Sequence, residues 1–266
     1  EELGLLHGLP MGIKDLEATE GIRTTWGSLP TKDTVPEADQ GSVAAVRAEG
    51  AILLGKTNTP EFGAGANTKN RVFGATGNPF NPELTCAGSS GGSAVALATG
   101  MVPIASGSDY GGSLRTPAGF CGVVGFRPSP GTVPAEGKAA ALMPWSVLGP
   151  MARTVADTAL LLQAQMDDDR RDPFSHLVDP RLFSSVDGLD LGSIHAAITP
   201  DLGCCPVDKG IADTFKARTD QFRGVFAEAQ DRAPDMGDIH RVFEIFRGIT
   251  FVAMHQERLK NHKDLL

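Results

Sequence analysis

Residues 86–127 read CAGSSGGSAVALATGMVPIASGSDYGGSLRTPAGFCGVVGFR, and this stretch decides the fold. It contains two glycine–serine clusters, at residues 88–93 and 107–113, and a short run compatible with a helix follows each cluster. Between the clusters an apolar segment, residues 102–105, is flanked by glycines and is typical of a buried strand. The order turn, helix, strand, turn, helix therefore indicates an α/β protein.

The same clusters are candidates for a site. Glycines ahead of a helix let backbone N–H groups approach a bound group closely, and hydroxyls placed among such donors suit nucleophilic acyl chemistry. The alternative is that the glycines only permit tight turns, which is the better interpretation of a single short motif. Two clusters with matched serines favour the site.

Bulk properties describe an ordinary globular protein. The 266 residues are 41% hydrophobic and 21% charged, which is enough apolar material for a core. A net charge of −8 argues against nucleic-acid binding, and no long apolar run predicts a membrane span. The cysteines lack metal-ligand spacing and the six histidines form no ligand-spaced pair, so we predict no metal, no disulfide framework and a reducing, cytoplasmic location.

Elements can be predicted on both sides of this stretch. Lys14 ends a short predicted strand, residues 11–14, in which Met11 and Ile13 share one face. A lysine in that position is more often an exposed residue that pairs with a neighbour such as Asp15 than a functional one. Further predicted elements are helices at 38–49, 154–166, 207–226 and 239–254 and strands at 51–54 and 194–198.

Ser90 also lies in a second motif, but the residues before that motif do not fit it. Residues 88–92 fit G-x-S-x-G, the nucleophile elbow of α/β-hydrolases, with Ser90 as nucleophile. That elbow needs a strand directly before it, whereas residues 78–85 carry two prolines and cannot form a central strand. We therefore do not assign Ser90 as the nucleophile.

Several motifs in order resemble the amidase signature family. They are GIKD around Lys14, GKTNTPEF at 55–62, GSSGGSA at 88–94, GSDYGGSLRTPA at 107–118, and then GFRPSPG and GPMARTVAD. The resemblance is close up to Asp157 and looser beyond it. Members of the family are longer, so we interpret the chain as shortened at both ends and its catalytic core as about residues 3–157 of a single domain, 1–266.

The resemblance implies a Ser-Ser-Lys triad. Ser113 is expected to be the nucleophile, Ser89 to relay its proton and Lys14 to act as the base. A lysine must be neutral to accept a proton, although its ordinary pKa lies about three units above pH 7. Burial against apolar neighbours can supply that shift, and the amine can later return the proton to the leaving nitrogen.

The resemblance also assigns supporting roles. The backbone N–H groups of Tyr110, Gly111, Gly112 and Ser113 are expected to form the oxyanion hole, and the Gly88–Ser89 peptide bond is expected to be cis. Asp109 and Arg115 are expected to form a buried ion pair. Ser90 and Ser93 are assigned to hydrogen bonding and helix capping.

The expected fold is a mixed, twisted β-sheet covered by helices on both faces. The expected activity is hydrolysis of a small-molecule carboxamide to a carboxylate and ammonia or an amine. We expect no cofactor and no binding to nucleic acid or a membrane. A homodimer is possible. One alternative is the glutaminase component, or A subunit, of a tRNA-dependent amidotransferase, which has the same triad. A second alternative, a catalytically silent scaffold, is opposed by the intact Lys14, Ser89 and Ser113.

Overall fold

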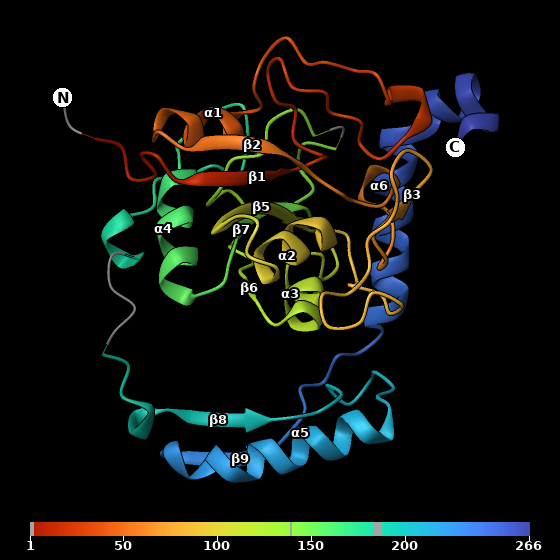
Figure 1. Cartoon of the computed structure of the whole chain (residues 1–266). Helices are drawn as coiled ribbons and strands as arrows, with labels where there is room; N and C mark the ends of the chain where they lie inside the picture. The colour runs from red at the N-terminus through yellow and green to blue at the C-terminus, as the bar shows by residue number, and fades with distance from the viewer. Residues whose placement is uncertain (1–2, 139, 184–187) are drawn as a thin grey trace. The chain divides into compact units, whose positions relative to one another are not determined.

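The computed structural model describes residues 3–138, 140–183 and 188–266, and it divides into two compact units (Figure 1). One unit comprises residues 1–186 together with 253–266, and the other comprises residues 187–252. The first contains the sheet β2-β1-β5-β7-β6, in which β1 is parallel to β2 and β5, while β7 runs antiparallel to β5 and β6. The expected mixed α/β fold class is confirmed.

The strands of this sheet are β1 (Pro10–Lys14), β2 (Ile52–Thr57), β5 (Ile104–Asp109), β6 (Val124–Gly125) and β7 (Val147–Ala152). Its helices are α1 (Gly41–Ala48), α2 (Gly91–Ala98), α3 (Arg115–Cys121) and α4 (Val155–Gln165). A small hairpin, β3 (Lys69–Asn70) with β4 (Gly74–Ala75), lies in the long connection from β2 to α2.

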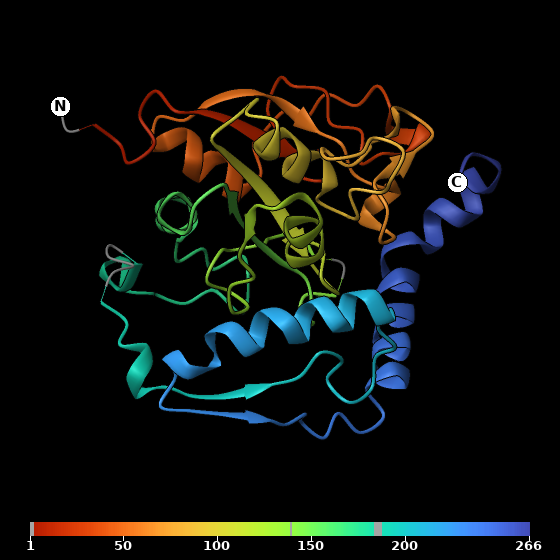
Figure 2. The same ribbon diagram turned by 60° about the horizontal axis from the view of Figure 1, so that its bottom comes forward.

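Alternation along the strands divides the core into two layers. Ile104 on β5 packs with α1 and α4, whereas the next residue, Ala105, packs with α2 and α3. On β7, Ala152 and Met151 divide in the same way. Successive strand side chains point to opposite faces, so one helix pair covers each face of the sheet (Figure 2).

The parallel pairing of β1 with β5 positions the site. Met11 is opposite Ile104 and Gly12 is opposite Ala105, so the carboxyl ends of both strands reach the same edge of the sheet. Lys14 ends β1, and Asp109 ends β5. Both glycine–serine clusters lie at this edge. The second includes the last residues of β5, and the first contacts it through the N–H of Ser90, which donates to the carbonyl of Ser113.

Most of the predicted elements are present, with shifted bounds. The helix predicted at 38–49 begins only at Gly41, and the helix predicted at 154–166 is α4, whose capping residue Thr154 accepts the N–H of Asp157. Strand β7 was not predicted, because Gly149 and Pro150 interrupt its apolar pattern, yet all six of its residues are buried. Pro150 is tolerated within the sheet, where its carbonyl accepts the N–H of Phe126 at 3.1 Å.

The second unit is a strand–helix–strand unit. β8 (His195–Ile198) and β9 (Glu228–Asp231) pair in parallel through α5 (Lys209–Phe222), the usual connection for parallel neighbours. α5 ends at Phe222, four residues before the predicted end at Phe226. A 3₁₀ turn, Arg223–Val225, follows it. The single domain predicted over residues 1–266 stays a prediction.

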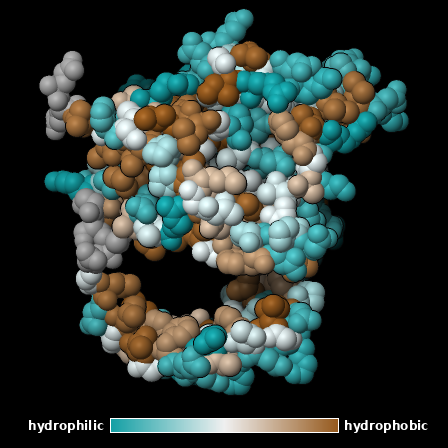
Figure 3. Space-filling view, viewed as in Figure 1, coloured by the Kyte–Doolittle hydropathy of each residue, from teal (hydrophilic) through white to brown (hydrophobic). Residues whose placement is uncertain are grey.

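The last helix, α6 (Ile239–His262), begins in the second unit and ends in the first. It is eight residues longer than predicted and half-exposed along much of its length. Apolar side chains also lie at the surface of the second unit (Figure 3). Ile211 and Phe222 of α5 are among the exposed apolar residues.

Among the described residues, no helix is both long and apolar enough to cross a membrane.

Candidate active site

The amine of Lys14 lies at the centre of a cluster of serine hydroxyls. Its side chain is fully buried, and Nζ donates to Ser89 Oγ at 2.8 Å, Ser90 Oγ at 2.8 Å and Ser108 Oγ at 2.9 Å. The backbone N–H of Lys14 donates to Ser106 Oγ at 2.9 Å. The alternative in which Lys14 is an exposed partner of Asp15 is therefore wrong, since Asp15 instead accepts hydrogen bonds from Thr25.

Burial makes this amine suitable as a base near neutral pH. Removal from water lowers the pKa of Lys14 from 10.5 to about 7, and the nearby carboxylates of Glu17 and Asp109 only partly oppose that effect. Much of the amine population is therefore neutral at pH 7. Neutral amine is the form that can take a proton from a hydroxyl.

Glu17 is the buried acid with the largest charge effect on this amine. Burial raises its pKa, while hydrogen bonds from Ser106 and Ser42 hold the carboxylate in place. The ammonium of Lys56 donates to the Glu17 carbonyl and to Thr19 Oγ1, and burial lowers the pKa of Lys56 to about 8. The Lys14 amine thus lies in a buried network of charges and hydroxyls.

The two serines on the amine differ in their other contacts. Ser90 Oγ lies 3.3 Å from both the carbonyl and the N–H of Ser108, which fixes it against β5. Ser89 Oγ accepts a hydrogen bond from Lys14, and the peptide bond before Ser89 is cis, as predicted. Ser90 occupies the N-cap position of α2 without a side-chain capping bond, so the capping role predicted for it is wrong.

Close backbone approach explains the glycines of the first cluster. A Cβ on Gly91 would lie 2.2 Å from Thr68 Oγ1, and one on Gly92 would lie 2.2 Å from the backbone nitrogen of Asn58. Ser93 packs beneath them, and its hydroxyl donates to the Ser106 carbonyl at 2.8 Å. Only glycine fits at the two positions that start α2.

Ser113 lies in the loop between β5 and α3 and is partly exposed. Its carbonyl accepts the N–H of Ser90 at 3.2 Å, so the two glycine–serine clusters are in direct backbone contact. Within the part of the chain that the structure describes, Ser113 Oγ has no hydrogen bond to Ser89, and the N–H groups of Gly111 and Ser113 have no protein acceptor.

The N–H of Gly112 is already in use. It donates to Asp109 Oδ1 at 2.8 Å, and the role predicted for Gly112 in an oxyanion hole stays a prediction. Gly112 has φ +114°, and a Cβ there would lie 2.6 Å from Thr116 Oγ1. The glycine is therefore required by the loop conformation.

Asp109 anchors this loop. Its carboxylate is fully buried and accepts the N–H of Leu114 at 3.1 Å, bonds from Arg115 at 3.0 and 3.1 Å, and one from Arg127 at 2.8 Å. Burial alone would raise the pKa of Asp109, but the bonds from Arg115, Gly112 and Leu114 outweigh it and hold that pKa at about 2. The predicted buried pair is right for Asp109 and wrong for Arg115, whose side chain is 56% exposed.

A one-turn 3₁₀ helix, Glu61–Gly63, lies beside Ser89. A Cβ added to Gly63 would be 3.6 Å from Ser89 Oγ. Its middle residue, Phe62, has φ 50° and contacts the C-terminal end of α6. The ring of His255 lies 4.7 Å from the Phe62 ring, and the guanidinium of Arg258 lies 4.8 Å from it. These aromatic and cationic groups, called the Phe62 wall, contact one another at the turn that carries Gly63.

Sequence reasoning missed several members of this network. Ser106 and Ser108 occupy alternate positions on β5, a period-two signal that could have placed both on the face toward Lys14. Glu17, three residues after Lys14, and Arg127 gave no comparable local signal, because their contacts span 89 and 18 residues of sequence. The structure also gathers Cys204, Cys205 and His240, which sequence spacing did not indicate.

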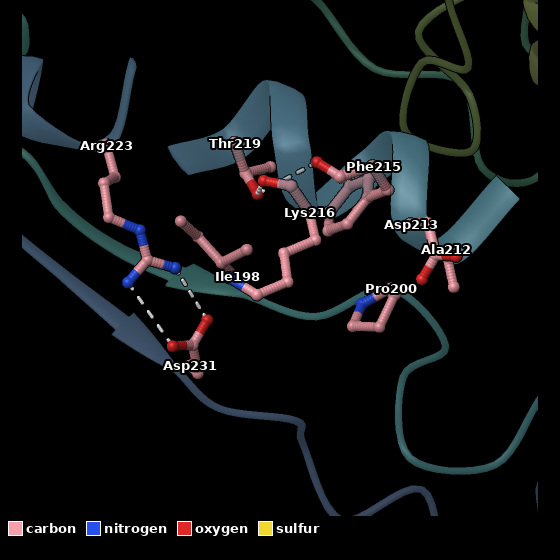
Figure 4. Close-up of a pocket in the computed structure, with 9 residues that line it drawn as sticks. All are labelled: Ile198, Pro200, Ala212, Asp213, Phe215, Lys216, Thr219, Arg223 and Asp231. Carbon is pink, nitrogen blue, oxygen red and sulfur yellow. Dashed lines mark hydrogen bonds and ion pairs between the residues drawn. The ribbon is translucent and has the colours of Figure 1, made fainter. Parts of the chain in front are cut away.

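A separate cavity of about 350 Å³ lies in the second unit, between α5 and the β8–β9 pair (Figure 4). Ion pairs occupy its charged lining residues, as in Arg223 with Asp231 at 2.8 Å and Lys216 with Asp220 at 2.6 Å. No residue of the predicted triad lines it.

The chain is similar to known proteins of one family. The sequence model of the family named Amidase matches residues 1–261. The chain is 37% identical to an acylamidase of Rhodococcus erythropolis over 90% of its own length and 50% of that protein. It is 45% identical to the A subunit of glutamyl-tRNA(Gln) amidotransferase from Thermus thermophilus over 73% of its length and 42% of that protein.

Solved structures indicate the same family. The crystal structure of a bacterial aryl acylamidase of the amidase signature family superimposes with a TM-score of 0.87 at 32% identity, over 98% of this chain and 55% of that one. The chain thus spans about half the length of the relatives that it matches. With the family match over nearly all its residues, this chain belongs to the amidase family.

Proposed function

We propose that this chain carries the catalytic core of an enzyme that hydrolyses carboxamide C–N bonds through an acyl-enzyme on Ser113. The observation that carries the proposal is the fully buried Lys14 amine, with a pKa of about 7, hydrogen-bonded to Ser89 next to the Ser113 loop. An amine with an ordinary pKa would be almost fully protonated at neutral pH and could not accept a proton.

In the first half of the proposed reaction, Ser113 Oγ attacks the amide carbon while its proton passes to Ser89 and that of Ser89 passes to Lys14. Negative charge develops on the carbonyl oxygen. The N–H groups of Gly111 and Ser113 are the donors we assign to this oxygen, together with the backbone of Tyr110. The lysine, now an ammonium, returns the proton through Ser89 to the leaving nitrogen, and the C–N bond breaks.

In the second half, water attacks the acyl-enzyme and gives up a proton along the same path. The ester bond to Ser113 breaks, the carboxylate product leaves and Ser113 regains its proton. Atoms balance as amide plus water giving acid plus amine. Ser90 holds Lys14 against β5 without taking part in transfer, because its hydroxyl is already bonded to Ser108.

We further propose a small-molecule amide as the substrate, with the Phe62 wall contacting it. The likeness to an acylamidase and to an aryl acylamidase supports acyl or aryl amides. The second candidate is the glutaminase component of a tRNA-dependent amidotransferase, supported by the 45% identity to the A subunit of the Thermus enzyme. A reducing, cytoplasmic setting suits both, since all four cysteines are free thiols.

Amide hydrolysis by serine-to-alanine variants tests the proposal. Ser113→Ala should lower kcat by at least ~10³-fold and Ser89→Ala by roughly 10²–10³-fold, whereas Ser90→Ala should lower it by less than ~10-fold. Ser193→Ala, at an exposed position far along the chain, is the matched control. Equal turnover by Ser113→Ala and the unaltered protein would refute the assignment.

The same assay separates the alternatives. Hydrolysis of simple aryl or acyl amides by the protein alone supports the first candidate. Ammonia release from glutamine only with partner proteins supports the second. No turnover and no acyl-enzyme under either condition would leave the silent scaffold as the explanation and overturn the proposal.

A further inference from the structure

Three side chains of the types that commonly bind thiophilic metal ions lie close together in the second unit. Cys204 and Cys205 lie in the turn after β8, and His240 is the second residue of α6. One ligand atom from each lies within 4.8 Å of the other two. All three belong to the compact unit of residues 187–252, so their proximity depends on that unit alone.

Hydrogen bonds fix the backbone that carries the two thiols. The carbonyl of Asp201 accepts the N–H of Cys204 at 3.2 Å and that of Cys205 at 2.9 Å, while its carboxylate accepts the N–H of Gly203 at 2.8 Å. Gly203 has φ +73°, which lets the turn fold back on itself. The thiols are therefore presented by a closed turn.

The histidine is held at the same place from the other side. Its Nε2 lies 3.1 Å from the carbonyl oxygen of Cys204, which orients the imidazole over the turn. The ring is exposed, so its side-chain torsions can rotate. The backbone of the turn is fixed by hydrogen bonds, and the imidazole lies against it.

The separation of the sulfur atoms matches one metal ion. Cys204 Sγ and Cys205 Sγ are 3.7 Å apart. Two thiolates bound to one tetrahedral zinc ion, each with a Zn–S bond of about 2.3 Å, are separated by about 3.8 Å. A disulfide would need about 2.05 Å, and both thiols are free in this structure. The sulfur atoms need not move to hold an ion.

We propose that Cys204, Cys205 and His240 form a binding site for a thiophilic metal ion, with Zn²⁺ as the probe. Two thiolate sulfurs and a neutral imidazole nitrogen are three of the four ligands of a tetrahedral zinc site, and a water molecule supplies the fourth. Binding releases one proton from each thiol and changes no oxidation state. The site is separate from the proposed hydrolysis, which needs no metal.

Its exposure makes the site testable without damage to the fold. Cys205 and His240 are exposed and Cys204 is partly exposed, so polar substitutions there remove little buried surface. Suitable variants are Cys204→Ser/Cys205→Ser and His240→Asn. His195→Asn is the matched control, since His195 is exposed in the same unit and pairs with Glu228 at 3.0 Å.

Cobalt absorption and zinc competition are the two measurements. The chelator-treated, reduced protein is titrated with Co²⁺, and thiolate-to-cobalt charge-transfer absorption is recorded; Zn²⁺ affinity is then measured against a chromophoric chelator. We expect one equivalent bound with a charge-transfer band. The double cysteine variant should lose the band and at least ~100-fold in Zn²⁺ affinity, and His240→Asn should lose roughly 10–100-fold.

The control defines the contrary result. His195→Asn should bind as the unaltered protein does, and all variants should keep the same metal-free circular dichroism spectrum. An absent charge-transfer band in the unaltered protein overturns the proposal. So does an undiminished Zn²⁺ affinity in the double cysteine variant.

Discussion

Among single residues, Lys14 matters most, because the proposed reaction depends on its charge. Its amine donates to three serine hydroxyls, and burial holds its pKa at about 7. The neutral form is the base in the proposed reaction, so kcat/KM for amide hydrolysis should rise with pH through about 7 and level off above it. A pH–rate profile of the free enzyme measures this limb.

Substitution of Glu17 should shift the pH–rate profile in one direction. Its carboxylate raises the pKa of Lys14, so Glu17→Gln should lower that pKa and move the acid limb to lower pH. The amide keeps the shape of the side chain. Its oxygen can accept from one of Ser42 and Ser106, while its NH2 group donates to the hydroxyl of the other. An acid limb that stays in place, or moves to higher pH, would show that Glu17 carries no charge that acts on the base.

A second residue-scale prediction concerns stability. The unfolded chain has Lys14 at its ordinary pKa of 10.5, whereas the folded chain has it at about 7, so between these values the unfolded state binds more protons. The contribution of this group to stability therefore rises with pH from about 7 to about 10.5, and its full penalty applies below 7. At about 1.4 kcal/mol per pH unit the penalty is roughly 4–5 kcal/mol.

Lys14→Met removes this penalty together with the base. Three lost hydrogen bonds, each worth about 1 kcal/mol, offset much of the gain. The variant should be inactive yet more stable at pH 7 by about 1–2 kcal/mol, with a Tm higher by a few degrees. Thermal unfolding at pH 7 and pH 10 checks both the sign and the pH dependence; a less stable variant at pH 7 would contradict the expected burial penalty.

Residue roles differed in how far sequence could predict them. Lys14, Ser89 and Ser113 lie in motifs, so resemblance could assign them by position. Their environment could not be assigned in this way, because Glu17 reaches the site through contacts with residues 25 and 89 positions away. The partial exposure of Arg115 and the use of the Gly112 N–H by Asp109 likewise follow from the folded loop.

At the scale of elements, the loop from β5 to α3 determines where Ser113 lies. Gly112→Ala adds a Cβ that would lie 2.6 Å from Thr116 Oγ1 at φ +114°. We expect the loop to shift, kcat/KM to fall by at least ~100-fold because donors to the oxyanion move, and stability to fall by about 1–3 kcal/mol. Steady-state kinetics and chemical denaturation measure the two effects.

Gly100→Ala is the control for that variant. Gly100 also has a positive φ, +75°, but nothing lies within 4 Å of a Cβ added there, and it follows α2 away from the loop. Its substitution should cost about 1 kcal/mol of stability and leave kcat/KM unchanged. If both alanine variants lost activity to the same extent, backbone strain alone would explain the loss and the loop would have no special role.

Elements with strong local patterns could be predicted from the sequence, and those defined by pairing could not. α4 combines a capping threonine with an apolar stripe, so its bounds agree within a residue. β7 has Gly149 and Pro150 in the middle and becomes a strand only because β5 and β6 flank it. β9 is short and polar, and its pairing with β8 identifies it as a strand.

At the scale of the whole molecule, the second unit exposes much apolar surface. Ile211 is 64% exposed on α5, and Ile245 and Val252 are 50% and 62% exposed on α6. The 266-residue chain expressed alone should therefore bind a hydrophobic dye such as ANS at pH 7 without denaturant. Fluorescence titration with ANS measures this binding, and the variant Ile211→Glu/Ile245→Glu should bind less dye. If the unaltered chain does not enhance ANS fluorescence, the expectation is contradicted.

The proposed mechanism requires neutral Lys14 to activate Ser113 through Ser89. A fluorophosphonate reagent, followed by peptide mapping with mass spectrometry, tests it directly. We predict a single adduct on Ser113, formed faster as the pH rises through about 7 and nearly absent in Lys14→Met. An adduct on Ser90, or labelling of Ser113 at an undiminished rate in Lys14→Met, would contradict the account.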